Sequence, residues 1–274
     1  MHYRHHFHAG NFADVFKHVL LTGLLTALSR KEKPFLYLDT HAGAGVYDLN
    51  SAEALRSAEA ATGVSQLFDQ TAPPEWTARY LSLVNSLESS RAIRKPYPGS
   101  PALAAKLLRE GDRLVCCENQ EGVAEQLRYT VPNAAIHVRS GYESHGFLPP
   151  PEKRGLVLMD PPFEDRREFS MLEEYLKKSL ARWSSGIFAI WYPVKQAHDP
   201  ERFVRRVRAF AHGDVLECTI DTGARSQGQM HACGMLIIHP PFGFETQART
   251  ELGWLTTRLA QGPRPVFSVE LRQP

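Results

Sequence analysis

Short apolar runs, each ended by a polar or turn residue, recur along this chain and limit the folds open to it. Runs of this length predict strands buried on both faces, as in a parallel sheet. Helical stretches lie between most of them, and alternation of strand and helix predicts a doubly wound α/β fold. The predicted strands are Phe35–Asp39, Leu114–Glu118, Ala135–Val138, Leu156–Asp160 and Ile187–Tyr192, and the clearest helical stretches are Pro101–Arg109, Val123–Tyr129 and Glu168–Trp183.

Helix-start signals mark two further elements. Asn11 can cap a helix that runs to about Ser29, with Asp14 near its positive end. Apolar residues at helical spacing predict that one face of this helix is buried. Ser100 followed by Pro101 predicts another helix start, with the serine as its cap.

The last third of the chain predicts a β-hairpin with a long loop. Two apolar runs, Val215–Ile220 and Met235–Ile238, flank the polar, glycine-rich segment Asp221–Gly234. A parallel sheet closed by such a hairpin resembles the Rossmann-like fold of the class I methyltransferases.

One interval is too long for a simple strand–helix–strand unit. Asp39 and Glu118 are 79 positions apart, whereas a βαβ unit takes roughly 30 residues. The excess carries helix formers broken by Pro73-Pro74. We therefore expect a methyltransferase domain over residues 1–48 and 98–274, with 1–10 as a segment that closes over the substrate, and a helical insertion subdomain over 49–97.

Composition excludes several classes. The chain has 274 residues with 32 basic and 30 acidic side chains, so any nucleic-acid-binding face must be a local patch. The longest apolar run, Val19–Leu28, is about half the ~20 residues that span a bilayer, and no signal peptide is visible. We expect a cytoplasmic protein whose four cysteines, none in a C-x-x-C pair, are buried free thiols.

The sharpest motif is Asp160-Pro161-Pro162-Phe163, directly after a predicted strand. Ligands of open α/β sheets bind beyond the carboxyl ends of the strands. An Asp160 carboxylate and the Pro161 carbonyl can each accept one hydrogen of an adenine N6 amine, which localises the nitrogen lone pair toward an incoming methyl group. The two prolines stiffen the loop, and Phe163 would stack on a base taken out of its helix.

A plain strand-ending turn is the alternative, since Asp and Pro are common in turns. His239-Pro240-Pro241-Phe242 also follows an apolar run but lacks the carboxylate. We interpret this second motif as a structural turn that ends the last predicted strand.

Three further features fit a nucleoside cofactor. The segment Asp39-Thr40-His41-Ala42-Gly43-Ala44-Gly45 follows the first predicted strand and resembles the D-x-x-x-G-x-G loop that cradles S-adenosylmethionine. Glu118 ends the second strand, where an acid can accept hydrogen bonds from ribose hydroxyls. Ser140-Gly141 follows the third, where the cofactor's adenine would lie. Each feature alone has a structural alternative, an ordinary turn or a solvated acid.

The N-terminus carries a dense histidine cluster within Tyr3–Asn11, and Lys17-His18 follow on the predicted helix. A metal site is one hypothesis, because histidine is the commonest transition-metal ligand. No matching carboxylate ligand set is present, so we expect no metal. A segment that contacts a base and its phosphates fits better.

These residues resemble one family, the RlmJ-type 23S ribosomal RNA adenine-N6 methyltransferases. The resemblance spans nearly the whole chain and is carried by Tyr3-Arg-His, Phe7-His-Ala-Gly-Asn, Ala13-Asp-Val, Lys17-His18, Lys33–Gly45, Tyr97–Pro101, Arg154-Gly155, Asp160-Pro-Pro and Trp191-Tyr-Pro193. It implies S-adenosylmethionine as cofactor and 23S ribosomal RNA as substrate, protein-free or in early assembly. The sequence does not determine the oligomeric state, for which we favour a monomer.

The resemblance also assigns residues. His18, His41, Ser100, Glu118, Ser140, Gly141 and Asp160 fall on the family's cofactor contacts, and Asp160 is also the catalytic acceptor. Tyr3, His5 and Lys17 fall on residues brought to the active site from the N-terminal segment. The chain departs from the family at Phe163, where tyrosine is frequent, and at Ser140, where aspartate is expected.

Other functions remain open. A DNA adenine methyltransferase uses the same motif but normally needs a larger target-recognition domain, and protein-glutamine methyltransferases usually have Asn in place of Asp160. A non-catalytic RNA-binding module and a zinc hydrolase are the remaining alternatives. We expect RNA affinity from a patch of the N-terminal segment with Arg166, Arg167, Lys177 and Lys178.

Overall fold

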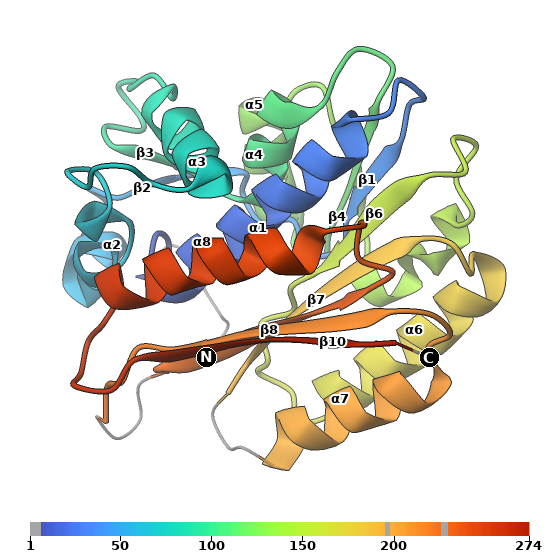
Figure 1. Ribbon diagram of the computed structural model, residues 1–274. Coiled ribbons are helices and arrows are strands. Elements are labelled where there is room, and N and C mark those ends of the chain that lie inside the picture. Colours follow the sequence, from blue (N-terminus) through green and yellow to red (C-terminus); the bar gives the residue numbers. More distant parts are fainter. Residues whose placement is uncertain (1–6, 195–197, 226–229, 274) are drawn as a thin grey trace.

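An eight-stranded sheet forms the centre of the protein. The computed structural model describes residues 7–194, 198–225 and 230–273, and the strand order is β10-β8-β9-β7-β6-β1-β4-β5 (Figure 1). The strands are β1 (Leu36–Asp39), β4 (Arg113–Glu118), β5 (Ala135–Val138), β6 (Gly155–Met159), β7 (Ile187–Pro193), β8 (Val215–Asp221), β9 (Ala232–Ile238) and β10 (Val266–Arg272).

The pairing confirms the predicted fold class. Strands β5, β4, β1, β6 and β7 are mutually parallel. The hairpin β8–β9 then joins antiparallel to β7 through β9. The sequence did not predict β10, which pairs antiparallel with β8 at the edge.

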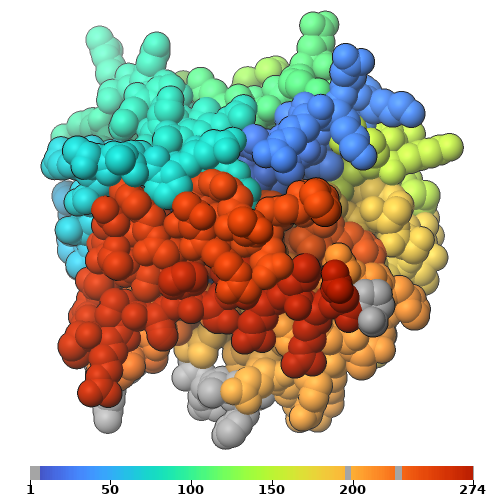
Figure 2. Space-filling view, in the orientation of Figure 1, coloured from blue at the N-terminus to red at the C-terminus, as the bar shows by residue number. Residues whose placement is uncertain are grey.

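Helices cover both faces of the sheet and make a three-layer sandwich. One face carries α1 (Phe12–Ser29), α4 (Ser100–Leu107), α5 (Glu121–Thr130) and α8 (Phe244–Arg258). The other carries α6 (Glu168–Arg182), α7 (His198–Phe210) and the short η4 (Gly141–Phe147). In Figure 2, α8 and β10 (red) cover much of the visible face, below the teal residues of the insertion.

The first helix is a core helix. The Asn11 side chain accepts a hydrogen bond from the Asp14 backbone N–H at 2.9 Å, which confirms the predicted cap. Burial extends beyond the one face that the spacing predicted, because α3, α4 and α8 pack around α1 and bury nearly its whole circumference. Helix α1 is long and apolar enough to cross a membrane, but 89% of it is buried inside the protein.

The segment between β1 and β4 contains helices, as expected. It contains α2 (Ala52–Ser57), η2 (Glu59–Thr62), η3 (Val64–Gln66) and α3 (Glu75–Asn85), and a two-stranded sheet of β2 (Val46–Asp48) and β3 (Pro96–Pro98) joins its two ends. Trp76 of α3 stacks on Phe244 of α8 at 4.4 Å, so this segment shares the core around α1 and α8. Its status as a separate subdomain stays a prediction.

Two local predictions need correction. Strand β5 is not buried on both faces, because it forms the edge of the sheet and all its residues are partly or fully exposed. The cap of α4 is Gly99, and Ser100 is the first helical residue. The Ser100 hydroxyl bonds to the buried Asp39 carboxylate and does not cap the helix. All four cysteines are buried and free, as predicted.

Candidate active site

A cleft of about 1750 Å³ opens beyond the carboxyl ends of β1, β4 and β6. This volume exceeds the roughly 300–1,000 Å³ of a typical small-molecule pocket, so it offers room for a cofactor and part of a second molecule. Twelve of the predicted site residues line it: Lys17, His18, His41, Gly43, Ser100, Glu118, Ser140, Gly141, Asp160, Pro161, Pro162 and Phe163.

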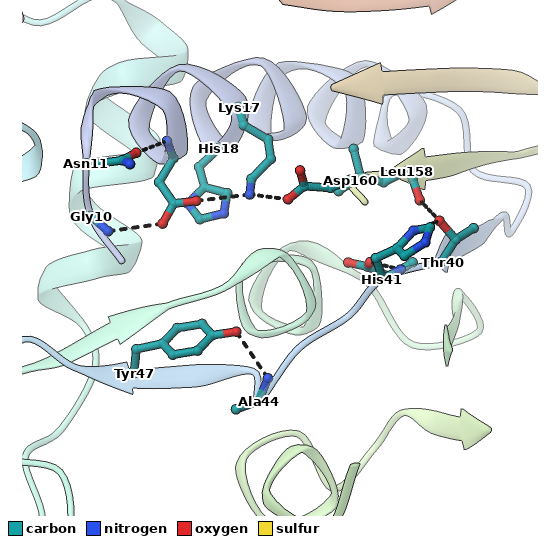
Figure 3. A network of polar contacts seen from close by, with 12 residues as sticks. Gly10, Asn11, Lys17, His18, Thr40, His41, Ala44, Tyr47, Leu158 and Asp160 are labelled. Atoms are coloured by element: carbon teal, nitrogen blue, oxygen red, sulfur yellow. Dashed lines mark hydrogen bonds and ion pairs between the residues drawn. The ribbon is translucent and has the colours of Figure 1, made fainter. Parts of the chain in front are cut away.

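Helix α1 brings a buried lysine to the end of β6. The Lys17 ammonium donates to Asp14 at 2.9 Å and to Asp160 across the cleft (Figure 3). Burial by itself would lower the pKa of Lys17, but the two carboxylates outweigh it and raise that pKa well above its ordinary value. Lys17 is therefore a permanent cation that partly neutralises Asp160.

The loop after β6 has an unusual backbone. Phe163 has a φ of +51°, which is rare for a bulky side chain. The Phe163 N–H donates to the buried Glu168 carboxylate at 2.8 Å, and its ring contacts Phe169 at 4.9 Å between centroids. Strained conformations held by their surroundings cluster at functional sites. Glu168 thus fixes the half-buried Phe163 ring at the cleft wall.

The loop after β1 is held against Glu118. The Glu118 carboxylate accepts from the backbone N–H of Gly43 at 3.0 Å and of Gln120 at 2.9 Å. Gly43 has a φ of +63°, and a Cβ there would lie 2.2 Å from the Tyr47 hydroxyl. A Cβ on Gly141 would lie 2.0 Å from the Thr40 carbonyl oxygen. Backbone alone fits here, as a cradle for a nucleoside cofactor requires.

Two histidines face the cleft with different partners. The Thr40 hydroxyl lies 2.8 Å from His41 Nδ1, and burial lowers the pKa of His41 to about 4. His41 is therefore neutral at neutral pH. His18 is fully buried, and its Nδ1 lies 3.0 Å from the Tyr97 hydroxyl.

Two predicted cofactor residues do not line the cleft. Asp39 is fully buried beneath the loop, where Tyr37 donates to it at 2.8 Å. Gly45 packs against α5, because a Cβ there would lie 2.4 Å from the Thr130 hydroxyl. Both residues support the loop and do not face a ligand. Tyr3 and His5 lie outside the described residues.

Several contributors were not found from sequence. Asp14, Tyr47, Glu168 and Glu59 all line the cleft. The first three contact Lys17, Ala44 and Phe163 within five positions of the chain, whereas Glu59 contacts His8 and Asn11 about fifty positions away, which no local motif indicates. Trp191 also lines it, and its place in the Trp-Tyr-Pro motif was the one available signal.

Other predicted features lie elsewhere or remain open. The His239 motif follows β9, which runs antiparallel to β7. The motif therefore lies at the opposite end of the sheet from the cleft, which agrees with a structural turn. In the predicted basic patch, Arg167 pairs with Asp165 at 2.7 Å and Lys178 with Glu174 at 2.7 Å. Among the described residues no cluster of three metal-ligating side chains occurs.

The strand order, the glycine-containing loop after β1, the acid after β4 and Asp-Pro-Pro after β6 together define an S-adenosylmethionine-dependent methyltransferase of the α/β class. A family model described as ribosomal RNA large subunit methyltransferase D, RlmJ, matches residues 32–270. The chain belongs to this RlmJ family.

Full-length relatives agree with the family. Ribosomal RNA large subunit methyltransferase J of Haemophilus influenzae is 37% identical, over 98% of this chain and 97% of that protein. The protein of the same name from Escherichia coli is 36% identical, over 94% and 93%. The crystal structure of protein LPL1258 from Legionella pneumophila superposes with a TM-score of 0.86 at 32% identity, covering 97% of this chain and 98% of that one.

Proposed function

We propose that this enzyme transfers the methyl group of S-adenosylmethionine to the N6 amine of an adenine in 23S ribosomal RNA. The observation that carries the proposal is the placement of Asp160 and Pro161 in one cleft with Glu118 and the loop at Gly43. The names of the Haemophilus and Escherichia relatives support large-subunit ribosomal RNA as the substrate.

The residues around the loop after β1 suit the cofactor. Glu118 would accept hydrogen bonds from the ribose hydroxyls of the cofactor. Gly43 and His41 would flank its methionine part, and Gly141 would lie under its adenine. When bound, the cofactor would supply an electrophilic methyl group on a sulfonium and would leave as S-adenosylhomocysteine, so the protein needs no covalent intermediate. The N6 amine forms the new C–N bond and releases one proton.

The protein's own chemistry then concerns the amine. An adenine N6 nitrogen is a poor nucleophile because its lone pair is delocalised into the ring. Hydrogen bonds from N6 to the Asp160 carboxylate and the Pro161 carbonyl localise this lone pair, and a ring stacked on Phe163 holds the base in line. Lys17 holds the Asp160 carboxylate through an ammonium that stays charged at neutral pH.

The decisive experiment measures transfer of labelled methyl groups to protein-free 23S ribosomal RNA and identifies the product nucleoside. Wild type should yield N6-methyladenosine, and Asp160→Ala should lower kcat by about a thousandfold, as loss of a well-placed polar group in the transition state does. Asp160→Asn is the matched control of shape, because its amide keeps one oxygen but loses the charge.

Three parallel substrates make the result specific. Assembled large subunits should be poorer substrates than protein-free RNA, and DNA of the same sequence should not be methylated. Label in a nucleoside other than N6-methyladenosine, or more than about a tenth of wild-type activity in Asp160→Ala, would contradict the proposal.

A further inference from the structure

We propose that Glu59, in the helical insertion, is a positioning residue for the catalytic carboxylate, acting through the start of α1. The inference rests on the catalytic role proposed for Asp160. It gives the insertion a part in the reaction besides its contribution to the core.

Glu59 holds the chain where it enters α1. Its carboxylate accepts from His8 Nδ1, with both oxygens at 3.0 Å, and from the Asn11 side-chain amide at 2.9 Å. Both partners belong to the turn that precedes the helix. One carboxylate from the insertion therefore fixes two side chains of this turn.

A continuous line of polar contacts runs from this turn to the active site. The side-chain amide oxygen of Asn11 accepts from the Asp14 backbone N–H at 2.9 Å. The Asp14 carboxylate accepts from the Gly10 N–H at 3.0 Å and from the Lys17 ammonium at 2.9 Å. Lys17 reaches Asp160, and Figure 3 shows this line from Gly10 and Asn11 to Asp160.

The position of Lys17 relative to Asp160 depends on the contacts of the turn before α1. The Lys17 ammonium lies between two carboxylates, and its place relative to Asp160 depends on where Asp14 is held. Misplacement of a reacting group by about an ångström can cost a hundredfold in rate. Loss of Glu59 releases the side chains of His8 and Asn11. The Asn11 side chain that holds the Asp14 N–H then loses its anchor, so Lys17 no longer holds Asp160 in one orientation.

Glu59 is not needed to keep the insertion in place. The Val64 N–H donates to the Gly10 carbonyl at 2.8 Å, and a Cβ on Gly63 would lie 2.0 Å from that same oxygen. The side chains of His8 and Glu59 are 40% and 35% exposed, and ion pairs open to solvent contribute little to stability. A Glu59 variant should therefore fold, which allows its effect on catalysis to be measured.

Steady-state kinetics with 23S RNA provide the first test. Glu59→Ala should lower kcat about tenfold while KM for RNA and for the cofactor stay within about twofold. Glu59→Gln should recover much of the loss, because its carbonyl oxygen can still accept from Asn11. Glu88→Ala, an exposed glutamate of the same insertion, is the matched control and should behave as wild type. A Glu59→Ala enzyme with wild-type kcat would overturn the proposal.

A double-mutant cycle tests the route. Asn11→Ser keeps a good helix cap but loses the amide that donates to Glu59. If Glu59 acts through this turn, the double variant should be scarcely slower than Glu59→Ala alone. Effects that multiply would show that Glu59 acts independently of Asn11, against the proposal.

An NMR measurement separates this inference from the proposed function. Lys17 is the buried lysine of the described chain, so its ammonium protons should exchange slowly enough to be followed with 15N-labelled lysine. Glu59→Ala should speed this exchange, and Glu88→Ala should not. Unchanged exchange in Glu59→Ala would overturn the Glu59 proposal even if the wild type methylates RNA. Faster exchange in an enzyme that does not methylate RNA would support the contact between Glu59 and Lys17 and refute only the proposed substrate.

Discussion

The Asp39 carboxyl group lies beneath the loop after β1, where water does not reach it. Burial raises the pKa of this group from 3.8 to about 6, although Ser100 and Tyr37 donate hydrogen bonds to it. Its backbone neighbour His41 donates from its N–H to Asp39 at 3.3 Å. The acid therefore supports the loop from below, and its protonation is linked to folding.

The raised pKa predicts a pH dependence of stability. A folded carboxyl whose pKa lies above its unfolded value stabilises the fold at low pH, and that contribution is lost as pH rises through about 6. Between pH 5 and pH 8 the wild type should lose about 1 kcal/mol of unfolding free energy relative to Asp39→Asn. Urea unfolding of both proteins at the two pH values measures this difference, and parallel pH profiles would contradict it.

At the scale of elements, one tertiary contact caps a helix. Helix α3 has Pro74 at its cap and no local side chain to satisfy its first N–H groups. Glu251 of α8 supplies the missing acceptor, since its carboxylate takes bonds from the N–H of Trp76 at 2.7 Å and of Thr77 at 3.0 Å. Glu251 is fully buried, so a helix from the end of the chain anchors the insertion.

Removal of this acceptor should be costly. Glu251→Ala leaves two buried N–H groups without partners, and each such group costs about 1–3 kcal/mol. We expect a loss of about 3 kcal/mol in unfolding free energy, measured by urea titration. Glu245→Ala on the same helix removes only an exposed pair with Arg249 and should cost under about 1 kcal/mol. Equal urea concentrations at the unfolding midpoint for the two variants would show that Glu251 does not anchor the insertion.

The elements that the sequence predicted and those that it missed differ in their local sequence pattern. Strands β1 and β6 are continuous apolar runs buried on both sides, and their pattern is unmistakable. Strand β10 has one buried residue, Val269, and lies at an edge. Strand β3 is Pro96-Tyr97-Pro98, a sequence that local propensity disfavours. These two segments are strands because each pairs with a neighbouring strand; their own sequences carry no strand pattern.

For the whole molecule, the charge of the cleft matters most. Eight carboxylate side chains line it: Asp14, Glu53, Glu59, Glu118, Asp160, Glu164, Asp165 and Glu168. Lys17 forms ion pairs with two of them, Asp14 and Asp160. Arg56 of α2 is exposed at the cleft wall, and it has no ion pair within the described residues. A polyanionic substrate entering this cleft would therefore meet Arg56.

This location predicts a measurable electrostatic role. Arg56→Ala should weaken RNA binding roughly fivefold and reduce the slope of log affinity against log salt by about 0.7, the value for one contact with a single-stranded phosphate. Arg79→Ala, an exposed arginine on α3 away from the cleft, is the matched control. Binding titrations at several salt concentrations measure both, and an unchanged slope in Arg56→Ala would exclude a phosphate contact.

Sequence patterns are sufficient to predict the alternation of strand and helix, the order of the loop, acid and Asp-Pro-Pro motifs, and hence the class of fold and chemistry. These follow from local patterns, because burial and chain reversal leave marks within a few residues. Tertiary structure decided which residues of the loop face the cleft, placing Gly43 there and Asp39 beneath it. It also decided that Lys17 meets Asp160, 143 positions away, and that Glu59 and Glu251 join distant elements, because such contacts depend on packing that no local pattern encodes.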